Sequence, residues 1–500
     1  MRPIVAGLIV FGASAAVLTL EILAVRLLAP YLGITVEVTT GVIGTVLAGI
    51  ALGTWLGGRL ADAVDPRRLL GPILFVGGVL ALTVIPMISL VANADVGPGP
   101  QGILIYAGTA FFLPAAVLSA AGPTVVKLQL EHLEQTGSIV GRYSAIGTAG
   151  AIVGSFVTGF VLVSAIPTRP IIVALGLALM AAGVVVAAVL GRSRPSALAA
   201  LALMVAGGAV LWTIVSPQPC QRESAYFCIS VEIISADGSE RLLRMDTLRH
   251  AYVDLDDPTH LEFAYTGLLG DVADAIAPPS VPIAVLHLGG GGFTLPRYVE
   301  ATRPSSTNRV LELDPLVLQV AREELGLAMW DGLSVVVGDG RLSMGDEPSG
   351  RYDLVIGDAF AGPAVPWHLT TTEFVAEVGR VLTPRGIYAI NIIDHPPLEL
   401  ARAQLATFAE VFGHVGVYGP ASRVEGASGG NVILLGSNQP LPERPILRMN
   451  RARGGDAHLA ASETEIAAFI DGAPVLRDDF APTDQLLTRF EVTAAAPLLP

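Results

Sequence analysis

Charged residues are scarce in this chain of 500 residues: they make up 15% of it, whereas apolar residues make up 52%. So low a charged fraction is unusual for a soluble protein and indicates segments that cross a membrane. Two cysteines, Cys220 and Cys228, are too few for a disulfide scaffold, and they lack the further ligands that zinc would need. They can form one local disulfide outside the cytoplasm or remain free thiols inside it. We expect no metal site.

The balance of positive and negative charge changes after Ser216. Up to that residue ten Lys and Arg stand against seven Asp and Glu, whereas twenty Arg stand against thirty-seven Asp and Glu beyond it. Such asymmetry marks two different environments, and the acidic half disfavours nucleic acid, whose phosphates need a basic face. Single cores rarely exceed about 250–300 residues. We predict a polytopic transmembrane domain at 1–216, a linker and β-hairpin region at 217–280, and an α/β domain at 281–500.

Seven apolar segments are long enough to cross a hydrocarbon core, which takes about 20 residues. They are residues 4–28, 41–60, 69–92, 103–126, 143–165, 171–190 and 197–215. The first is too long for a cleaved signal peptide. Glu21 and Arg26 lie inside it, where ionisable groups are costly and suggest a functional pair or a polar cavity. Arg26 can instead extend its charge towards the helix end.

Basic residues are distributed unequally between the loops on the two sides of these segments. Eight lie on the N-terminal side and two, Arg26 and Arg169, on the other. The segment from Gly57 to Arg68 also resembles a cytoplasmic loop of major facilitator superfamily transporters. We therefore expect a cell-membrane protein with a cytoplasmic N-terminus. Either the α/β domain then lies on the outer face, as seven spans imply, or one of the seven segments is not a true span.

The second half of the sequence has a different periodicity. Short strands at 229–234, 241–245 and 251–253 predict a small β-hairpin region. From Pro282 onwards strands alternate with helical patterns at 316–325 and 371–382, which implies crossovers and a largely parallel sheet. The strands are expected at 283–288, 309–313, 333–337, 354–356, 387–392 and 431–435.

Glycines or acidic residues follow four of these strands, where open α/β sheets bind ligands. After the first strand come Gly289, Gly290, Gly291 and Gly292. Without side chains there, a ligand can press against the backbone. Glu312 ends the second strand and can accept ribose hydroxyls. Asp339 and Gly340 follow the third, offering a carboxylate to an adenine amino group, and Asp358 follows the fourth. Each acid has an alternative role as a loop or helix-cap residue, but their order favours a nucleoside site.

The motifs resemble those of the spermidine synthase (polyamine aminopropyltransferase) family, in its membrane-fused branch. The similarity covers residues 242–437, with HLGGGGF starting at His287, LELD ending at Asp314, VGDG ending at Gly340 and YDLVIGD ending at Asp358. The resemblance implies a Rossmann-like domain with the class I S-adenosylmethionine-binding fold. It also implies decarboxylated S-adenosylmethionine, or S-adenosylmethionine itself, as co-substrate.

The resemblance also assigns residues to the nucleoside. Glu312 would hold the ribose, and Asp339 with Gly340 would hold the adenine, beside the glycine loop. His250 stands where the family usually has a cofactor-binding glutamine, and a surface histidine is the alternative.

On the amine side, the resemblance makes Asp358 the proton acceptor and places Tyr265 in the substrate pocket. Trp367 could add a wall that stacks on a cation, or it could be a packed tryptophan. Two departures matter: Gly292 and Ala361 stand where the family has aspartates. Because such carboxylates bind and deprotonate the amine, their loss puts ordinary putrescine chemistry in doubt.

Three hypotheses follow. The first is aminopropyl transfer from decarboxylated S-adenosylmethionine to a small amine, and the second is methyl transfer from S-adenosylmethionine. The third is a non-catalytic transporter or sensor with a nucleoside-binding domain. We expect a lipid bilayer and a small amine as partners and no nucleic acid; a homodimer is left open.

Overall fold

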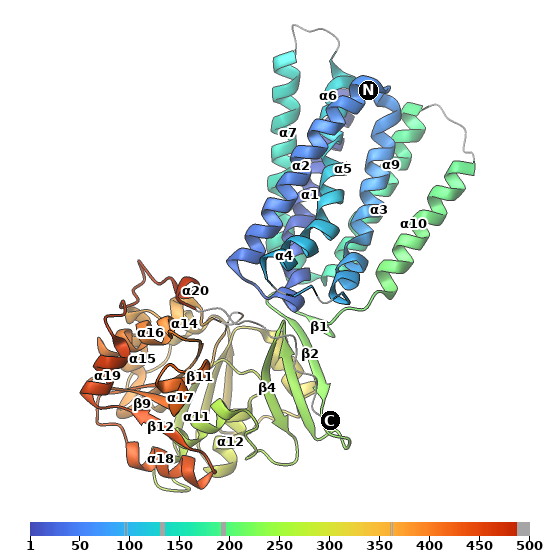
Figure 1. Cartoon of the computed structure of the whole chain (residues 1–500). Helices are drawn as coiled ribbons and strands as arrows, with labels where there is room; N and C mark the ends of the chain where they lie inside the picture. The colour runs from blue at the N-terminus through green and yellow to red at the C-terminus, as the bar shows by residue number, and fades with distance from the viewer. Residues whose placement is uncertain are drawn as a thin grey trace. The chain divides into compact units, whose positions relative to one another are not determined.

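The computed structural model describes residues 1–94, 96–97, 99–130, 136–191, 197–360, 362 and 364–487. The chain divides into two compact units, Met1–Cys228 and a second unit that begins at Ile229 (Figure 1). The first unit is mainly helical. The second unit contains an eight-stranded sheet and most of a four-stranded sheet.

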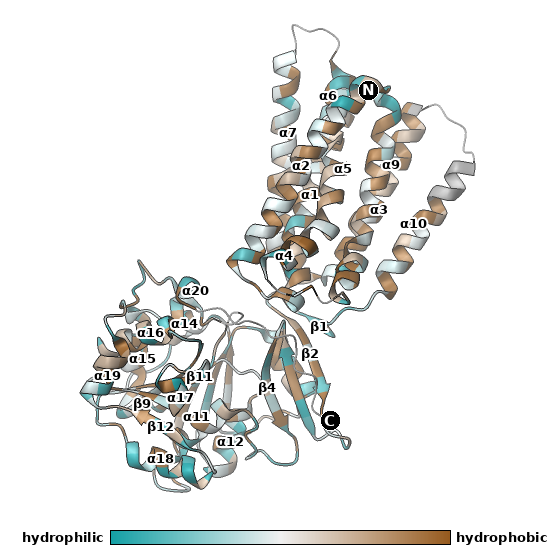
Figure 2. Cartoon of the chain, viewed as in Figure 1, coloured by the Kyte–Doolittle hydropathy of each residue, from teal (hydrophilic) through white to brown (hydrophobic). Residues whose placement is uncertain are grey.

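The first unit consists of consecutive helices. They are α1 (Pro3–Leu32), α2 (Val36–Ala63), α3 (Pro66–Ala92), α4 (Pro100–Ala107), η1 (Gly108–Phe112), α5 (Leu113–Ser119), α6 (Ala121–Gln129), α7 (Thr136–Val157), η3 (Thr158–Leu162), α8 (Val163–Ala165), α9 (Thr168–Gly191) and α10 (Ala197–Val215). Within the described residues, six continuous helical stretches are long and apolar enough to cross a membrane. Figure 2 shows apolar residues along their length.

The starts of these helices follow from local chemistry. Pro3, Pro66 and Pro100 occupy first helical positions, where a missing backbone N–H costs nothing because that group has no partner inside the helix. Thr35 caps α2 by accepting a hydrogen bond from the Val38 backbone N–H at 3.2 Å.

Glycines bring α1 and α7 into close contact. A Cβ atom on Gly150 would lie 2.2 Å from the Phe11 carbonyl oxygen, and one on Gly154 would lie 2.5 Å from that of Ala15. Small residues at such crossings let backbones approach in an apolar environment.

The seventh predicted segment coincides with α10, in which Leu203–Val215 is described as a shorter apolar helix. Its Thr213 hydroxyl is buried and donates a hydrogen bond to the Leu82 carbonyl of α3. Arg192 and Arg194, two of the eight basic loop residues, lie outside the described residues. The count of seven spans therefore stays a prediction.

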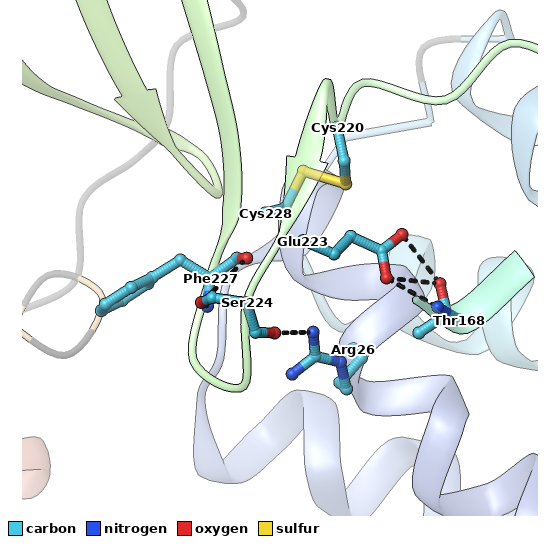
Figure 3. Close-up of a disulfide and its surroundings, with 7 residues drawn as sticks. All are labelled: Arg26, Thr168, Cys220, Glu223, Ser224, Phe227 and Cys228. Carbon is cyan, nitrogen blue, oxygen red and sulfur yellow. Dashed lines mark hydrogen bonds between the residues drawn. A yellow bond between two sulfur atoms is a disulfide. The ribbon is translucent and has the colours of Figure 1, made fainter. Parts of the chain in front are cut away.

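A disulfide closes the segment that follows α10. Cys220 and Cys228 are bonded, with Cα atoms 5.0 Å apart (Figure 3). Arg26, near the end of α1, reaches this loop and donates hydrogen bonds to the carbonyls of Ser224 and Ala225, the latter at 2.7 Å. Of the two expected roles for Arg26, the extension of its charge towards the helix end agrees with these contacts.

The same loop is tied to the start of α9. The Glu223 carboxylate accepts hydrogen bonds from the Thr168 backbone N–H at 2.8 Å and from its hydroxyl at 2.9 Å. The neighbouring Arg169 donates to the carbonyls of Ile214 and Ser216, each at 2.6 Å. Arg26 and Arg169, the two basic residues expected on one side, therefore both contact the segment after α10.

The second unit begins with an antiparallel sheet and continues as an α/β domain. Its strands are β2 (Cys228–Ile233), β3 (Glu240–Met245), β4 (Leu248–Asp254), β5 (Ala284–Leu288), β6 (Thr307–Glu312), β7 (Leu333–Val337), β8 (Tyr352–Gly357), β9 (Leu382–Asp394), β10 (His414–Pro420), β11 (Gly430–Ser437) and β12 (Ala457–Ala460); β1 (Arg222–Glu223) precedes them. The main helices are α11 (Ala264–Ala275), α12 (Thr294–Thr302), α13 (Pro315–Glu323), α14 (Gly340–Met344), α15 (Thr372–Val381), α16 (Glu399–Ala409), α17 (Ala421–Val424), α18 (Glu443–Ala452), α19 (Glu463–Ile470) and α20 (Thr483–Leu486), with the turn η4 (Trp367–Leu369).

The large sheet has the strand order β12-β10-β11-β9-β8-β5-β6-β7. The five strands β7, β6, β5, β8 and β9 are parallel, which confirms the predicted mostly parallel sheet, and β11, β10 and β12 join by antiparallel pairing. The strand order reverses between β5 and β8, which is where sheets of this kind bind ligands.

Helices cover both faces of the sheet. Leu268 and Val272 of α11 pack with Ile356 and Ile433 on one face. On the other face, α15 and α16 pack against Leu286 and Ile390, which belong to β5 and β9. β10 and β12 were not predicted, since β12 has only four residues and β10 contains two glycines and a proline.

Candidate active site

Asp358 follows β8 at the point where the strand order reverses. The Tyr265 hydroxyl of α11 donates a hydrogen bond to Asp358 Oδ2 at 3.2 Å, and the Asn391 amide of β9 donates to Oδ1 at 3.0 Å. The structure therefore brings together the predicted proton acceptor and the predicted pocket tyrosine. Each carboxylate oxygen has one protein donor and keeps capacity to accept another hydrogen bond.

Burial shifts the protonation equilibria of this group. Desolvation raises the pKa of Asp358 to about 6, although hydrogen bonds from Asn391 and Tyr265 act in the opposite direction by stabilising the carboxylate. Burial and the neighbouring carboxylate hold the pKa of Tyr265 well above its usual value, so the phenol remains a donor. A carboxylate with a pKa near 6 is partly protonated just below neutrality and suits proton acceptance.

Asn391 was not predicted from the sequence. It is 1% exposed and interrupts the apolar residues of β9. A lone amide within the otherwise apolar run Ile387–Ile393 of this strand was the available signal, because a buried amide needs hydrogen-bond partners.

The glycine loop after β5 is built closely against the strand ends. Gly289 and Gly291 have φ angles of 94° and 48°, which side-chain-bearing residues rarely adopt. A Cβ atom on Gly289 would lie 2.5 Å from the Asp358 carbonyl oxygen. The Gly290 backbone N–H donates to Glu312 Oε2 at 2.7 Å. The loop, the acid of β6 and Asp358 thus meet at one place.

Glu312 is 6% exposed at the end of β6. Its Oε1 accepts the Asp314 backbone N–H at 2.9 Å, and burial raises the pKa of the carboxyl group, with backbone hydrogen bonds opposing the shift. Asp314 itself caps α13. Glu312 also accepts a backbone hydrogen bond from Gly291, and its contact with the ribose hydroxyls stays a prediction.

Asp339 is at once a helix cap and a predicted adenine ligand. Its Oδ1 accepts hydrogen bonds from the backbone N–H groups of Arg341 and Leu342, at 2.9 and 3.0 Å, at the start of α14, where Gly340 is the first residue. Its Oδ2 lies 3.3 Å from His368 Nε2. The helix cap uses Oδ1, and Oδ2 faces the His368 ring.

Trp367 lies in η4, is 49% exposed and packs edge-on against the His368 ring. The polar contact of this turn runs through His368 to Asp339, and not to Asp358. The role of Trp367 as an amine-pocket wall therefore stays a prediction, beside the alternative of a packed tryptophan.

His250 lies in β4, and its carbonyl oxygen lies 3.3 Å from the Tyr265 hydroxyl, whose single proton it shares with Asp358 Oδ2. Burial lowers the pKa of its ring to about 4, so the imidazole is neutral near pH 7. The strand thus supports Tyr265, while contact of the His250 ring with a nucleoside stays a prediction. Among the described residues, no cluster of three or more His, Cys, Asp or Glu could hold a metal ion.

Comparison with known proteins places this geometry in context. No family model matches the chain. A probable spermidine synthase from Corynebacterium glutamicum is 30% identical, with 53% of this chain and 98% of that one covered, at a TM-score of 0.48. This chain belongs to the spermidine synthase-like family. It is also 29% identical over 155 residues to a polyamine aminopropyltransferase from Vibrio vulnificus, covering 31% of this chain and 50% of the relative.

The spermidine synthase-like unit also resembles methyltransferases. An eEF1A lysine and N-terminal methyltransferase from Danio rerio is 31% identical over 144 residues, which cover 27% of this chain and 21% of that protein. The chain spans half or less of the length of the two curated relatives named here. The polyamine aminopropyltransferase and spermidine synthase relatives support a class I S-adenosylmethionine-type fold for this unit.

One departure from the family has a physical explanation. A Cβ atom on Gly292 would lie 2.7 Å from the Ala251 Cβ and 2.8 Å from Val253 Cγ2, both in β4. Because those contacts are too short, the loop has no room for an aspartate unless β4 moves. Ala361, the other departure, lies outside the described residues.

Proposed function

We propose that this protein is a membrane-bound aminopropyltransferase that uses a decarboxylated sulfonium nucleoside to alkylate a small amine. The observation that carries the proposal is the Asp358 carboxylate, which has a raised pKa and is held by Tyr265 and Asn391 beside the glycine loop. The aminopropyltransferase relatives support it.

In the proposed step, the amine nitrogen attacks the carbon beside the sulfonium sulfur. The nitrogen lone pair forms the new C–N bond as the C–S bond breaks. The electron pair of the C–S bond stays on sulfur, which becomes a neutral thioether. Asp358 accepts a proton from the nitrogen, because an ammonium ion has no lone pair with which to attack. Tyr265 and Asn391 hold the carboxylate in place, and Glu312 with Asp339 would hold the nucleoside.

A second candidate, methyl transfer from S-adenosylmethionine, is favoured by Gly292. The close approach of Ala251 and Val253 leaves no carboxylate at that position to pair with the ammonium of a decarboxylated tail. A donor that keeps its own carboxylate needs no such partner. The methyltransferase relatives support the same alternative.

We also propose that the six long helices and α10 span the cell membrane with the N-terminus in the cytoplasm and the catalytic unit outside. Arg26, near the end of α1 away from Met1, and Arg169 both donate hydrogen bonds to the segment after α10. The disulfide in that segment supports an oxidising compartment. A cytosolic nucleoside would then have to be supplied outside, which makes the topology a decisive test of the whole proposal.

The test uses the full chain in detergent or nanodiscs. Calorimetry would compare S-adenosylmethionine, its decarboxylated form and methylthioadenosine, and mass spectrometry would follow a panel of amines. The leading proposal expects tighter binding of the decarboxylated donor and a product heavier by one aminopropyl group. Methyl transfer alone would establish the second candidate, and binding without turnover would favour the non-catalytic sensor or transporter.

A further inference from the structure

The amide of Asn391 is itself held in one orientation by a second amide. Its Nδ2 donates to Asp358 Oδ1 at 3.0 Å, and its Oδ1 accepts a hydrogen bond from Asn431 Nδ2, also at 3.0 Å. Asn391 pairs with Ile433 and Asn431 pairs with Ile393 in the antiparallel ladder of β9 and β11. The two amides therefore lie diagonally on one face of the sheet, within reach of each other.

An amide side chain can present either its NH₂ group or its oxygen to a neighbour. Turned the other way, Asn391 would aim its oxygen at the Asp358 carboxylate, and that contact is favourable only if Asp358 carries a proton. In the described part of the chain, Asn431 is the partner of Asn391 Oδ1. A donor at residue 431 therefore selects the orientation that stabilises the ionised carboxylate.

The start of β11 holds Asn431 in position. The Arg423 guanidinium donates to the Asn431 carbonyl at 3.2 Å, and a Cβ atom on the preceding Gly430 would lie 2.8 Å from Arg423 Cζ. Gly430 has a φ of 130°, which residues with a side chain rarely adopt. The backbone of Asn431 is thus held by Arg423 and Gly430. Neither of these residues touches Asp358.

We propose that Asn431 is a positioning residue that, through Asn391, keeps the Asp358 carboxylate oriented and ready to accept a proton. The inference rests on the proposed function for its biological meaning, but the arrangement itself can be tested without turnover. The titratable side chain that contacts Asp358 is Tyr265 of α11, and His250 of β4 adjoins that tyrosine through its carbonyl. Neither contacts Asn431 in the described interactions.

The experiment measures the protonation of Asp358 in the full chain by infrared difference spectroscopy, with Asp358→Asn identifying the carboxylic acid band. Asn431→Ala removes the donor, and we expect the titration midpoint to rise by about 0.4–1 pH unit, as for the loss of one hydrogen bond. Asn431→Asp should raise it further, because an acceptor at residue 431 attracts the Asn391 NH₂ group and turns its oxygen to Asp358. Ser428→Ala, in the loop before β11, is the matched control and should leave the midpoint unchanged.

A double-mutant cycle separates this relay from a general effect of charge or folding. In an Asn391→Ala background, the substitutions at Asn431 should no longer move the midpoint. A shift that persists undiminished there, or no shift in Asn431→Ala, would overturn the relay. If the midpoints move as expected but no amine is ever alkylated, the relay stands and the aminopropyltransferase proposal fails. If amines are alkylated but the midpoints stay unmoved, the relay fails and the aminopropyltransferase proposal stands.

Discussion

The Tyr265 hydroxyl donates a hydrogen bond to Asp358 Oδ2 at 3.2 Å, although the two residues are 93 positions apart in the sequence. One lies at the start of α11 and the other directly after β8. Helix α11 packs on one face of the large sheet. The contact therefore links that helix to the carboxyl end of a parallel strand.

Asp358→Asn should abolish turnover and leave nucleoside binding within a factor of a few of the wild type. The amide keeps the shape and the hydrogen bond from Tyr265 but cannot accept the amine proton. Turnover assays and calorimetry on the full chain would measure both effects. Asp346→Asn, at an exposed position, is the control. Retention of more than a few per cent of turnover would remove Asp358 from the chemistry.

The pH profile should report the same carboxylate. Asp358 acts as a base only when ionised, so kcat/KM should fall below about pH 6, where the pKa of Asp358 lies. Tyr265→Phe removes a hydrogen bond that stabilises the ionised form; the pKa of Asp358 then rises, and the acid limb moves to higher pH. Steady-state kinetics between about pH 5 and 8, on both sides of the pKa of Asp358, would show the position of the acid limb. An acid limb that moves to lower pH would contradict the assigned hydrogen bond.

The nucleoside site can be tested with a variant that separates binding from helix capping. Glu312→Ala and Asp339→Ala should each weaken nucleoside binding by about 1–3 kcal/mol, the cost of losing a hydrogen-bond partner. Asp339→Ala also loses the cap of α14, at about 1 kcal/mol of stability. Asp339→Asn keeps an oxygen for the cap but replaces the second oxygen with a donor, so stability should be retained while nucleoside binding is weakened by about 1–3 kcal/mol. Full binding in both alanine variants would exclude this site.

The disulfide can be tested by counting thiols, because Cys220 and Cys228 are the only cysteines in the chain and no other thiol contributes to the count. Protein purified from membranes without reductant should take up no alkylating reagent under denaturing conditions, and two equivalents after reduction. Intact mass spectrometry would count them. Cys220→Ser should take up one equivalent without reductant. Uptake of two equivalents by unreduced wild type would show free thiols and weaken the case for an outer location.

Topology is the prediction on which most of the proposal depends. Alkaline phosphatase fused after Pro500 should be active, and a fluorescent protein fused there should be dark, because seven spans invert the side on which the chain begins. Fusions after Asp65, in the loop between α2 and α3, should behave in the opposite way and serve as the control. A fluorescent C-terminal fusion would show that one predicted segment is not a span.

The sequence by itself determined the class of each half, because both signals are local. Long apolar runs identify helices suited to lipid, and glycines or acids after alternating strands identify the sheet edge, at Gly289, Glu312, Asp339 and Asp358. The tertiary structure decided which side chains surround Asp358. Asn391 and Asn431 come from antiparallel neighbours in the sheet, so no spacing along the chain brings them together. It also decided that Gly292 faces Ala251 and Val253 of β4, since the packing of a loop against a distant strand leaves no periodic trace in the sequence.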